Sequence, residues 1–414
     1  MRISDSKYSL ALVWTAVATS SFVFQEPALT DLLSILALGL FFVFGMRIPS
    51  GFGVAGIFLG MYLVANVVAS ALTPEPLDSL RSMSVRFFMA ANCLLFVCLI
   101  YENPHKVLRV IWSGFIVAAL ISVAAGMIGY YGLGLSYIVI ENGRVRALFK
   151  DPNVYGPFLV PVVLYALARI ETASQRQMLG YGALIGICAF GLLLGFSRGS
   201  FINFAVALAL YFIIRIRTQR SAIKRQRVIW TFLGLIIGGI IVVGGAASTE
   251  KVQNMLEVRM KVVQYYDTGE GGRMTRQMEI LDEIMVTPIG IGAGQSEKES
   301  FFREAPHNVY LHVLIEAGWI GGFSFFAFLI FTLYKGGRYF RIAGDVDGIN
   351  IAAYACVVGI LVQSIFIDST HWRHLFLLLA MIWGPVLYWE HQQLLLRRVV
   401  RAPQIPRENT ALRT

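Results

Sequence analysis

Three closely spaced cations in the stretch GRVRALFKDPN are the first group of residues that could do chemistry. They lie just before a predicted helix that begins near Asn153, and they are Arg144, Arg146 and Lys150. Asp151 or Asn153 can cap that helix, and the proline between them suits its first turn. Capping does not account for the cations. Because a helix N-terminus with nearby guanidinium groups attracts anions, we predict a phosphate-binding site here.

Three more arginines stand at other breaks in the apolar sequence. Arg198 lies in the very short break FSRGS. It either snorkels to the membrane interface or is buried with an anionic partner, since an unpaired intramembrane arginine is costly. Arg273 and Arg276 are three residues apart, hence on one face at the start of a helix predicted over 273–286. They belong either to a solvated face or to a lid with phosphate-binding arginines, and we favour the lid.

The stretch APHNVYLHVLIEAGWIGG (305–322) places polar side chains at the head of an apolar helix. His307 lies at the start, where water and a substrate hydroxyl can reach it. A histidine titrates near pH 6.5 and can take a proton at neutral pH, so we predict His307 as a general base. The alternative is a capping or interfacial histidine. We expect Asn308 to cap or orient the helix, and His312 and Glu316 to be structural.

Membrane helices are the elements that must position these residues. The chain has 414 residues, of which 57% are hydrophobic and 14% charged, which excludes an ordinary water-soluble globule. Apolar stretches long enough to cross a hydrocarbon layer of roughly 30 Å recur along its whole length. We therefore predict an all-α polytopic membrane protein with about twelve transmembrane helices. They are expected at 8–24, 31–47, 52–72, 85–101, 107–129, 153–169, 178–196, 198–214, 228–246, 307–334, 348–366 and 375–391.

These spans divide the chain into four parts. Spans one to nine occupy residues 1–246, a large outer loop 247–306, spans ten to twelve 307–391, and a basic tail 392–414. The loop is expected to hold helices at 254–266 and 273–286, followed by TPIGIGAGQ (287–295), a glycine-rich turn with close backbone approach. The four cysteines all fall inside apolar runs, so we interpret them as core residues and predict neither a disulfide framework nor a zinc site.

Basic loops set the orientation of the spans. Segments 215–227, 334–341 and 397–414 are rich in Lys and Arg and are predicted to be cytoplasmic, as are both termini. The net charge of +10 is then mainly a topology signal, and nucleic-acid binding is the weaker interpretation. Segments 137–153, 196–200, 247–306 and 368–374 fall together outside, and the last, DSTHWRH, adds Arg373. We expect its histidines, His371 and His374, to be interface residues. The acids of GDVDG (344–348) fall on the opposite side, which argues against a metal site there.

The ordered set GRVRALFKDPN, SRGS, GGRMTRQMEILDEIMVTPIGIGAGQ and HNVYLHVLIEAGWIGG resembles the O-antigen ligase and polymerase superfamily. The motifs cover roughly residues 140 to 335. The resemblance implies an inverting glycosyltransferase of the GT-C type in the bacterial inner membrane, which works at the periplasmic face without metal or cofactor. Its donor would be a glycan on undecaprenyl diphosphate. Its acceptor would be a glycan or the lipid A core.

The resemblance also assigns roles to particular residues. His307 and Arg273 are implied to be catalytic, with Arg276 as a second candidate for the loop arginine. Arg144, Arg146, Lys150, Arg198 and Arg276 would bind the diphosphate. Supporting roles fall to Asp151, Asn153, Asn308 and Arg373. Arginine can stabilise charge on a departing diphosphate without metal, which agrees with this assignment.

The sequence leaves two questions open: the acceptor of the transfer, and whether the protein is a transferase or a transporter. The FKDPNVYGPF form of the motif at 149–158 favours a polymerase of O-antigen or exopolysaccharide repeats over a ligase to the lipid A core, and transfer to protein is a third possibility. A transporter or flippase also fits about twelve spans. We prefer the transferase because the sequence shows no clear internal repeat, and because the charged residues gather at one face and in one loop.

Overall fold

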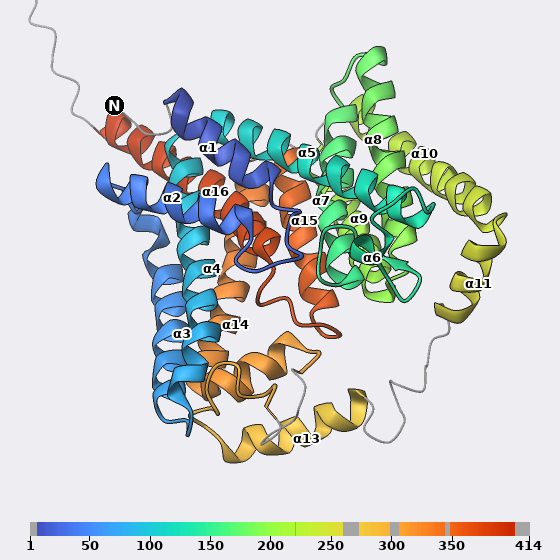
Figure 1. The fold of residues 1–414 in the computed structure, drawn as a ribbon. Coiled ribbons are helices and arrows are strands. Elements are labelled where there is room, and N and C mark those ends of the chain that lie inside the picture. Colours follow the sequence, from blue (N-terminus) through green and yellow to red (C-terminus); the bar gives the residue numbers. More distant parts are fainter. Residues whose placement is uncertain (1–5, 220, 260–272, 299–305, 344–347, 402–414) are drawn as a thin grey trace, which may run out of the picture.

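The computed structural model describes residues 6–219, 221–259, 273–298, 306–343 and 348–401. Apart from one two-stranded hairpin, the regular structure in these ranges is helical (Figure 1). The elements are α1 (Lys7–Ala18), α2 (Leu29–Val43), η2 (Ser50–Phe52), α3 (Gly53–Ala71), α4 (Pro76–Glu102), α5 (Pro104–Tyr130), α6 (Ser136–Val139), β1 (Ile140–Glu141), β2 (Arg144–Val145), α7 (Pro152–Ile170), α8 (Gln175–Leu194), α9 (Arg198–Thr218), α10 (Ala222–Ala247), α11 (Glu250–Arg259), α13 (Arg273–Val286), α14 (Val309–Ala343), α15 (Gly348–Gln363) and α16 (Arg373–Arg401).

The helix lengths support a multi-pass membrane protein. Among the described residues, eight helices are long and apolar enough to cross a membrane, and α2 and α15 are shorter apolar helices. The span predicted at 8–24 is the 12-residue helix α1, which at 1.5 Å per residue reaches only about 18 Å. The span predicted at 85–101 begins earlier, at Pro76, and the one predicted at 307–334 continues to Ala343.

Two groups of helices form the bundle. In the first, α3 packs on α14, α16 on α4, and α1 on α5; in the second, α15 packs on α9 and α7, and α7 on α8. Rings fill the contact between α5 and α7, where Phe115 and Phe158 lie 4.7 Å apart between centroids and both are buried. Apolar packing of this kind fixes the helix ends that carry the polar residues.

Residues of the segments 137–153, 196–200 and 368–374 lie at one end of the bundle, where Ser197 contacts Asn153 and both Lys150 and Arg373 contact Glu26. Gln363 at the end of α15 donates to the carbonyl of Asn153 at 3.3 Å, and the amide of Val309 donates to Ser364 O at 2.9 Å. Arg373 at the start of α16 pairs with Asp31 at the start of α2. We call this end the mouth.

Candidate functional site

A tight hairpin holds Arg144 at the mouth. Strands β1 and β2 pair Glu141 with Arg144, and the turn between them is Asn142–Gly143, both with positive φ (49° and 76°). Asn-Gly is the preferred pair for such a turn, because its backbone twist matches that of the flanking strands. The hairpin was not predicted, although IENGRV carries this signal.

Asn153 joins Arg144 to the starts of two helices. Arg144 Nη2 donates to Asn153 Oδ1 at 2.9 Å and Arg144 Nε to Gly195 O at 3.1 Å. Ser197 Oγ donates to the same Asn153 oxygen at 2.7 Å. Asn153 lies in the first turn of α7, and Ser197 caps α9, so the positive ends of both helix dipoles meet beside the guanidinium. Such a junction attracts an anion.

Capping at this junction follows the sequence prediction. Asp151 is the residue that caps α7, because its carboxylate accepts from the amide of Asn153 at 2.7 Å. Arg198 is the first residue of α9 and is half-buried, as the short break before it required. Arg144 and Arg198 thus begin neighbouring elements, strand β2 and helix α9.

The other two cations of the motif point to different partners. Lys150 forms an ion pair with Glu26 at 2.7 Å, and Arg146 lies 3.8 Å from Glu141 and 3.4 Å from the carbonyl of Lys150. Partial burial would raise the pKa of Glu26, but the hydrogen bond and charge of Lys150, with the charge of Arg373, hold that pKa below its usual value. Lys150 is therefore tied to the segment before α2.

Arg373 makes a strong contact within the protein. Its Nε and Nη2 atoms lie 2.6 Å from the two carboxylate oxygens of Asp31, a bidentate arrangement, and Nη2 lies 3.5 Å from Glu26. Asp31 also accepts from the amide of Ala28 at 2.8 Å at the start of α2. Arg373 thus holds α16 against the N-terminal helices, which is a supporting role of a structural kind.

Helix α13 and the glycine-rich turn after it pack on the first part of α14. Helix α13 begins at Arg273, as predicted, and lies beside the first part of α14 (Figure 1). Its Ile280 and Ile284 are buried against Leu311 and Ile315. The side chain of Arg273 lies outside the described residues. Arg276, one turn further on, is half-buried. The amphipathic spacing of α13 is therefore explained by packing on α14.

The glycine-rich turn lies against a break in α14. Gly318 has φ 68° and ψ −176°, so the helix is interrupted there. A Cβ on Gly290 would lie 2.4 Å from Gly318 N, and one on Gly318 would lie 2.4 Å from Ile289 O. The amide of Trp319, freed by the break, donates to Pro288 O at 2.9 Å. The predicted close approach of this backbone is confirmed, and its partner is α14.

His307 lies directly before α14 at the mouth and is half-buried. Asn308 caps the helix, because its Oδ1 accepts from the amides of Tyr310 at 2.9 Å and Leu311 at 3.2 Å. The predicted capping role of Asn308 is confirmed. His307 is held next to the loop at 364–372 by the Val309–Ser364 bond.

A line of charged side chains runs from this loop into the bundle. Asp368 Oδ2 lies 2.9 Å from His312 Nδ1, and His312 Nε2 lies 3.1 Å from Glu316 Oε2. Glu316 pairs with Arg86 of α4, and Ser296 Oγ donates to its other oxygen at 2.5 Å. At the outer end, His371 Nδ1 lies 3.3 Å from Asp368 Oδ2. We call the five residues Arg86, Glu316, His312, Asp368 and His371 the charge line.

The charge line was missed in the sequence. His312 and Glu316 were expected to be structural, and His371 an interface residue. Two signals were present: the four-residue spacing of His312 and Glu316, which places them on one helix face, and an arginine, Arg86, inside an apolar window. Burial raises the pKa of Asp368, but the charge and hydrogen bond of His312, with those of His371, outweigh burial and hold that pKa well below its usual range.

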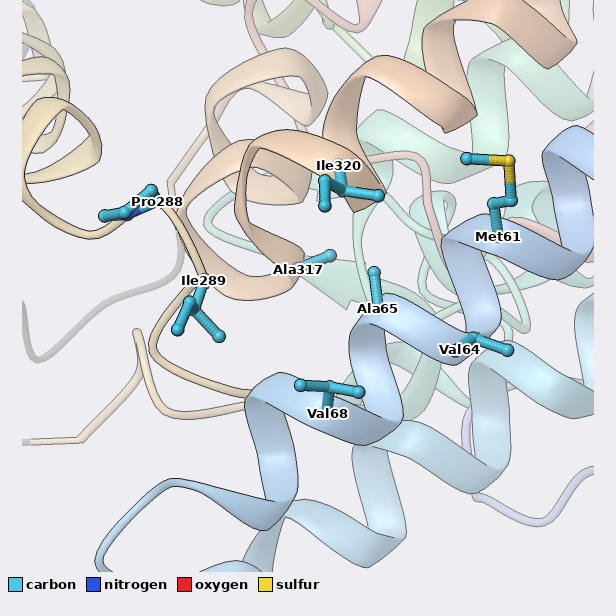
Figure 2. Close-up of a pocket in the computed structure, with 8 residues that line it drawn as sticks. All are labelled: Met61, Val64, Ala65, Val68, Pro288, Ile289, Ala317 and Ile320. Carbon is cyan, nitrogen blue, oxygen red and sulfur yellow. The ribbon is translucent and has the colours of Figure 1, made fainter.

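An apolar cavity of about 350 Å³ adjoins the break in α14 (Figure 2). Residues from three segments line it: Met61, Val64, Ala65 and Val68 of α3, Pro288 and Ile289 of the glycine-rich turn, and Ala317 and Ile320 of α14. Such a lining suits a hydrocarbon chain and offers a sugar few hydrogen-bonding partners.

Comparison with known proteins adds a family assignment to this geometry. The chain matches no curated protein. Residues 183–326 match the family model described as O-antigen ligase. The matched part begins in α8 and includes Arg198, the outer loop and the start of α14 with His307, whereas the hairpin and α16 lie outside it. This segment is therefore similar to the O-antigen ligase family.

Proposed function

We propose that the protein is a membrane glycosyltransferase that moves a glycan from undecaprenyl diphosphate to an acceptor hydroxyl at the periplasmic face of the bacterial inner membrane. The observation that carries this proposal is the junction of Arg144, Asn153 and Ser197, where two helix N-termini meet beside a guanidinium. The superfamily match supports the same class of reaction.

The donor would bind with its diphosphate at the mouth. Arg144 and Arg198 lie at or beside the helix starts, and the loop arginines Arg273 and Arg276 would complete the site. Guanidinium groups and helix dipoles stabilise charge that develops on the departing diphosphate, and they are already oriented before the reaction. The apolar cavity beside α14 offers a place for part of the isoprenoid chain.

Transfer then needs activation of the acceptor. The hydroxyl oxygen attacks the anomeric carbon from the face opposite the diphosphate, which inverts the configuration, and its proton passes to an imidazole at the mouth. The family motif nominates His307 for a catalytic role at the mouth. The FKDPNVYGPF motif favours polymerisation of repeat units over ligation to the lipid A core.

The proposal is tested with purified protein in nanodiscs and the lipid-linked glycan extracted from the source cells. The wild type should release undecaprenyl diphosphate and form an extended glycan. His307→Ala and Arg144→Ala should each lower the rate at least about 100-fold, the lower end expected when a catalytic side chain or a donor to the developing charge is lost. Arg109→Ala, an exposed arginine on α5, is the matched control and should leave the rate unchanged.

The choice of acceptor distinguishes a polymerase from a ligase. An extended glycan formed with lipid-linked repeat units alone supports a polymerase, and a product formed on added lipid A core supports a ligase. If the wild type formed no product with either acceptor while the lipid-linked glycan crossed the bilayer, the glycosyltransferase proposal would be abandoned for a transporter.

A further inference from the structure

The imidazole of His371 is partly exposed at the mouth, and its Nδ1 atom contacts Asp368 and Thr370. Its side chain is 37% exposed, and its Nδ1 lies 3.3 Å from Asp368 Oδ2 and 3.0 Å from Thr370 Oγ1. Because a carboxylate only accepts hydrogen bonds, a neutral His371 carries its hydrogen on Nδ1. The lone pair of Nε2 is then the basic position that remains for a hydroxyl.

Asp368 is itself fixed in place. Its Oδ1 accepts from the amide of Thr370 at 2.9 Å, and its Oδ2 accepts from the Thr370 hydroxyl at 2.9 Å and lies 2.9 Å from His312 Nδ1. Its side chain is only 16% exposed. A carboxylate held from several sides can fix both the tautomer and the orientation of the imidazole it contacts, as in hydrolase triads.

The inner end of the charge line sets the charge on Asp368. His312 lies between two carboxylates, at 2.9 Å from Asp368 and 3.1 Å from Glu316, so both of them favour a positive charge on its imidazole. Charges then alternate along Arg86, Glu316, His312 and Asp368, and these four groups sum to zero. The charge of His312 therefore favours the ionised carboxylate of Asp368, which faces His371 Nδ1.

We propose that His371 is the proton acceptor for the attacking hydroxyl and that Asp368 is its positioning residue. This assignment rests on the proposed glycosyltransferase function. The acceptor oxygen forms the new bond to the anomeric carbon, and its proton moves to His371 Nε2. The bond from that carbon to the diphosphate oxygen breaks, and the electron pair leaves with the diphosphate. His307 is then available to donate a hydrogen bond to the diphosphate.

The pH dependence of transfer tests the assignment. Charged groups around His371 are Asp368, His312, Arg373 and Glu26, the last from the segment before α2. In nanodiscs, with the lipid-linked glycan of the source cells, the wild-type rate should fall at acidic pH as the base becomes protonated. His371→Ala should lower kcat about 100- to 10,000-fold. The rate that remains should no longer fall at acidic pH; we call this fall in the pH profile the acidic limb. Added imidazole should restore part of the rate.

Asp368→Asn separates positioning from a merely structural role. Without the carboxylate, the imidazolium form is less stable, so the acidic limb should move to lower pH as the rate falls. His371→Gln, which keeps a polar group without a base, replaces the alanine variant if that one fails to fold. His105→Ala, an exposed histidine at the start of α5, is the matched control.

Binding of undecaprenyl diphosphate helps to distinguish failure of the His371 assignment from failure of the proposed glycosyltransferase function. The Kd of the His371 variants for this lipid should lie within about twofold of the wild-type value, which also shows that the variants are folded. A wild-type protein that transfers glycan, with a His371→Ala variant that keeps its rate or its acidic limb, would overturn the role of His371 alone. A wild-type protein that transfers nothing would overturn the proposed function itself.

Discussion

Arg86 and Glu316 are 230 positions apart in the sequence and form an ion pair whose side chains are 3% and 0% exposed. The pair links α4 to the first part of α14, and Arg86 also donates to Asn66 of α3. Three helices are thus joined at one buried point, directly beneath the loop that carries Asp368.

Removal of one partner of this pair should be costly. Glu316→Ala leaves the Arg86 guanidinium buried without its carboxylate, and we expect a loss of about 3–5 kcal/mol in the free energy of unfolding. Chemical unfolding in mixed micelles measures it. Glu75→Ala, which removes an exposed partner of Lys298, is the control and should cost about 1 kcal/mol or less. Equal losses in the two variants would contradict the importance of the buried pair.

Gly318 should not accept a side chain. Its φ of 68° and ψ of −176° lie in a region that essentially only glycine occupies, and a Cβ there would lie 2.4 Å from Ile289 O. Gly318→Ala should lower the free energy of unfolding by at least about 1–3 kcal/mol, seen as a lower thermal midpoint in detergent. Gly234→Ala on α10, where a Cβ would meet nothing within 4 Å, should leave the midpoint unchanged or slightly higher. A Gly318→Ala protein as stable as the wild type would show that the break is not needed.

The carboxylate of Asp368 should stabilise the protein in a defined pH range. Because its pKa is lowered on folding, the contribution is complete above the ordinary aspartate value of about 4 and is lost as the pH falls toward the folded-state pKa. The difference in thermal midpoint between the wild type and Asp368→Asn should thus be largest above about pH 5 and shrink below about pH 4. Asp282→Asn, on the exposed face of α13, should show no such trend. A difference that grew toward acid pH would be inconsistent with a lowered pKa.

Loss of Arg373 should affect the stability of the protein, whereas loss of Arg144 should affect its affinity for undecaprenyl diphosphate. Arg373 is bound to Asp31 in a bidentate pair, so Arg373→Ala should destabilise the protein while the Kd for undecaprenyl diphosphate changes less than about twofold. Arg144→Ala should weaken that binding about 10-fold or more, the loss of one charge-assisted contact. Arg144→Lys should restore little, because an ammonium cannot reproduce the planar pair of donors. Native mass spectrometry with undecaprenyl diphosphate measures both constants, and equal effects would refute the division of roles.

Much of the helix layout could be predicted from apolar window length alone. The boundaries failed where polar residues belong to a helix: α4 begins at Pro76 because Ser79 of its first turns accepts from Gln295, and Glu75 and Asp78 pair with Lys298. Such contacts depend on a loop more than 200 residues away, which no local window includes.

In the candidate site, too, local features could be predicted and long-range contacts could not. Asp151 and Asn308 were predictable as caps because capping is a local property of the sequence. The break at Gly318 depends on contact with the glycine-rich turn, and the charge line depends on which helices pack together. Histidine roles were therefore the hardest to predict, since only packing decides whether an imidazole meets a carboxylate.

The contact between Gly290 and Gly318 also sets a rule for hybrid proteins. Because each backbone occupies the space that a side chain of the other would need, the second half of the outer loop and the head of α14 can change only together. Chimeras between ligases and polymerases should therefore exchange residues 287–319 as one segment, with junctions directly after α13 and directly after the break in α14.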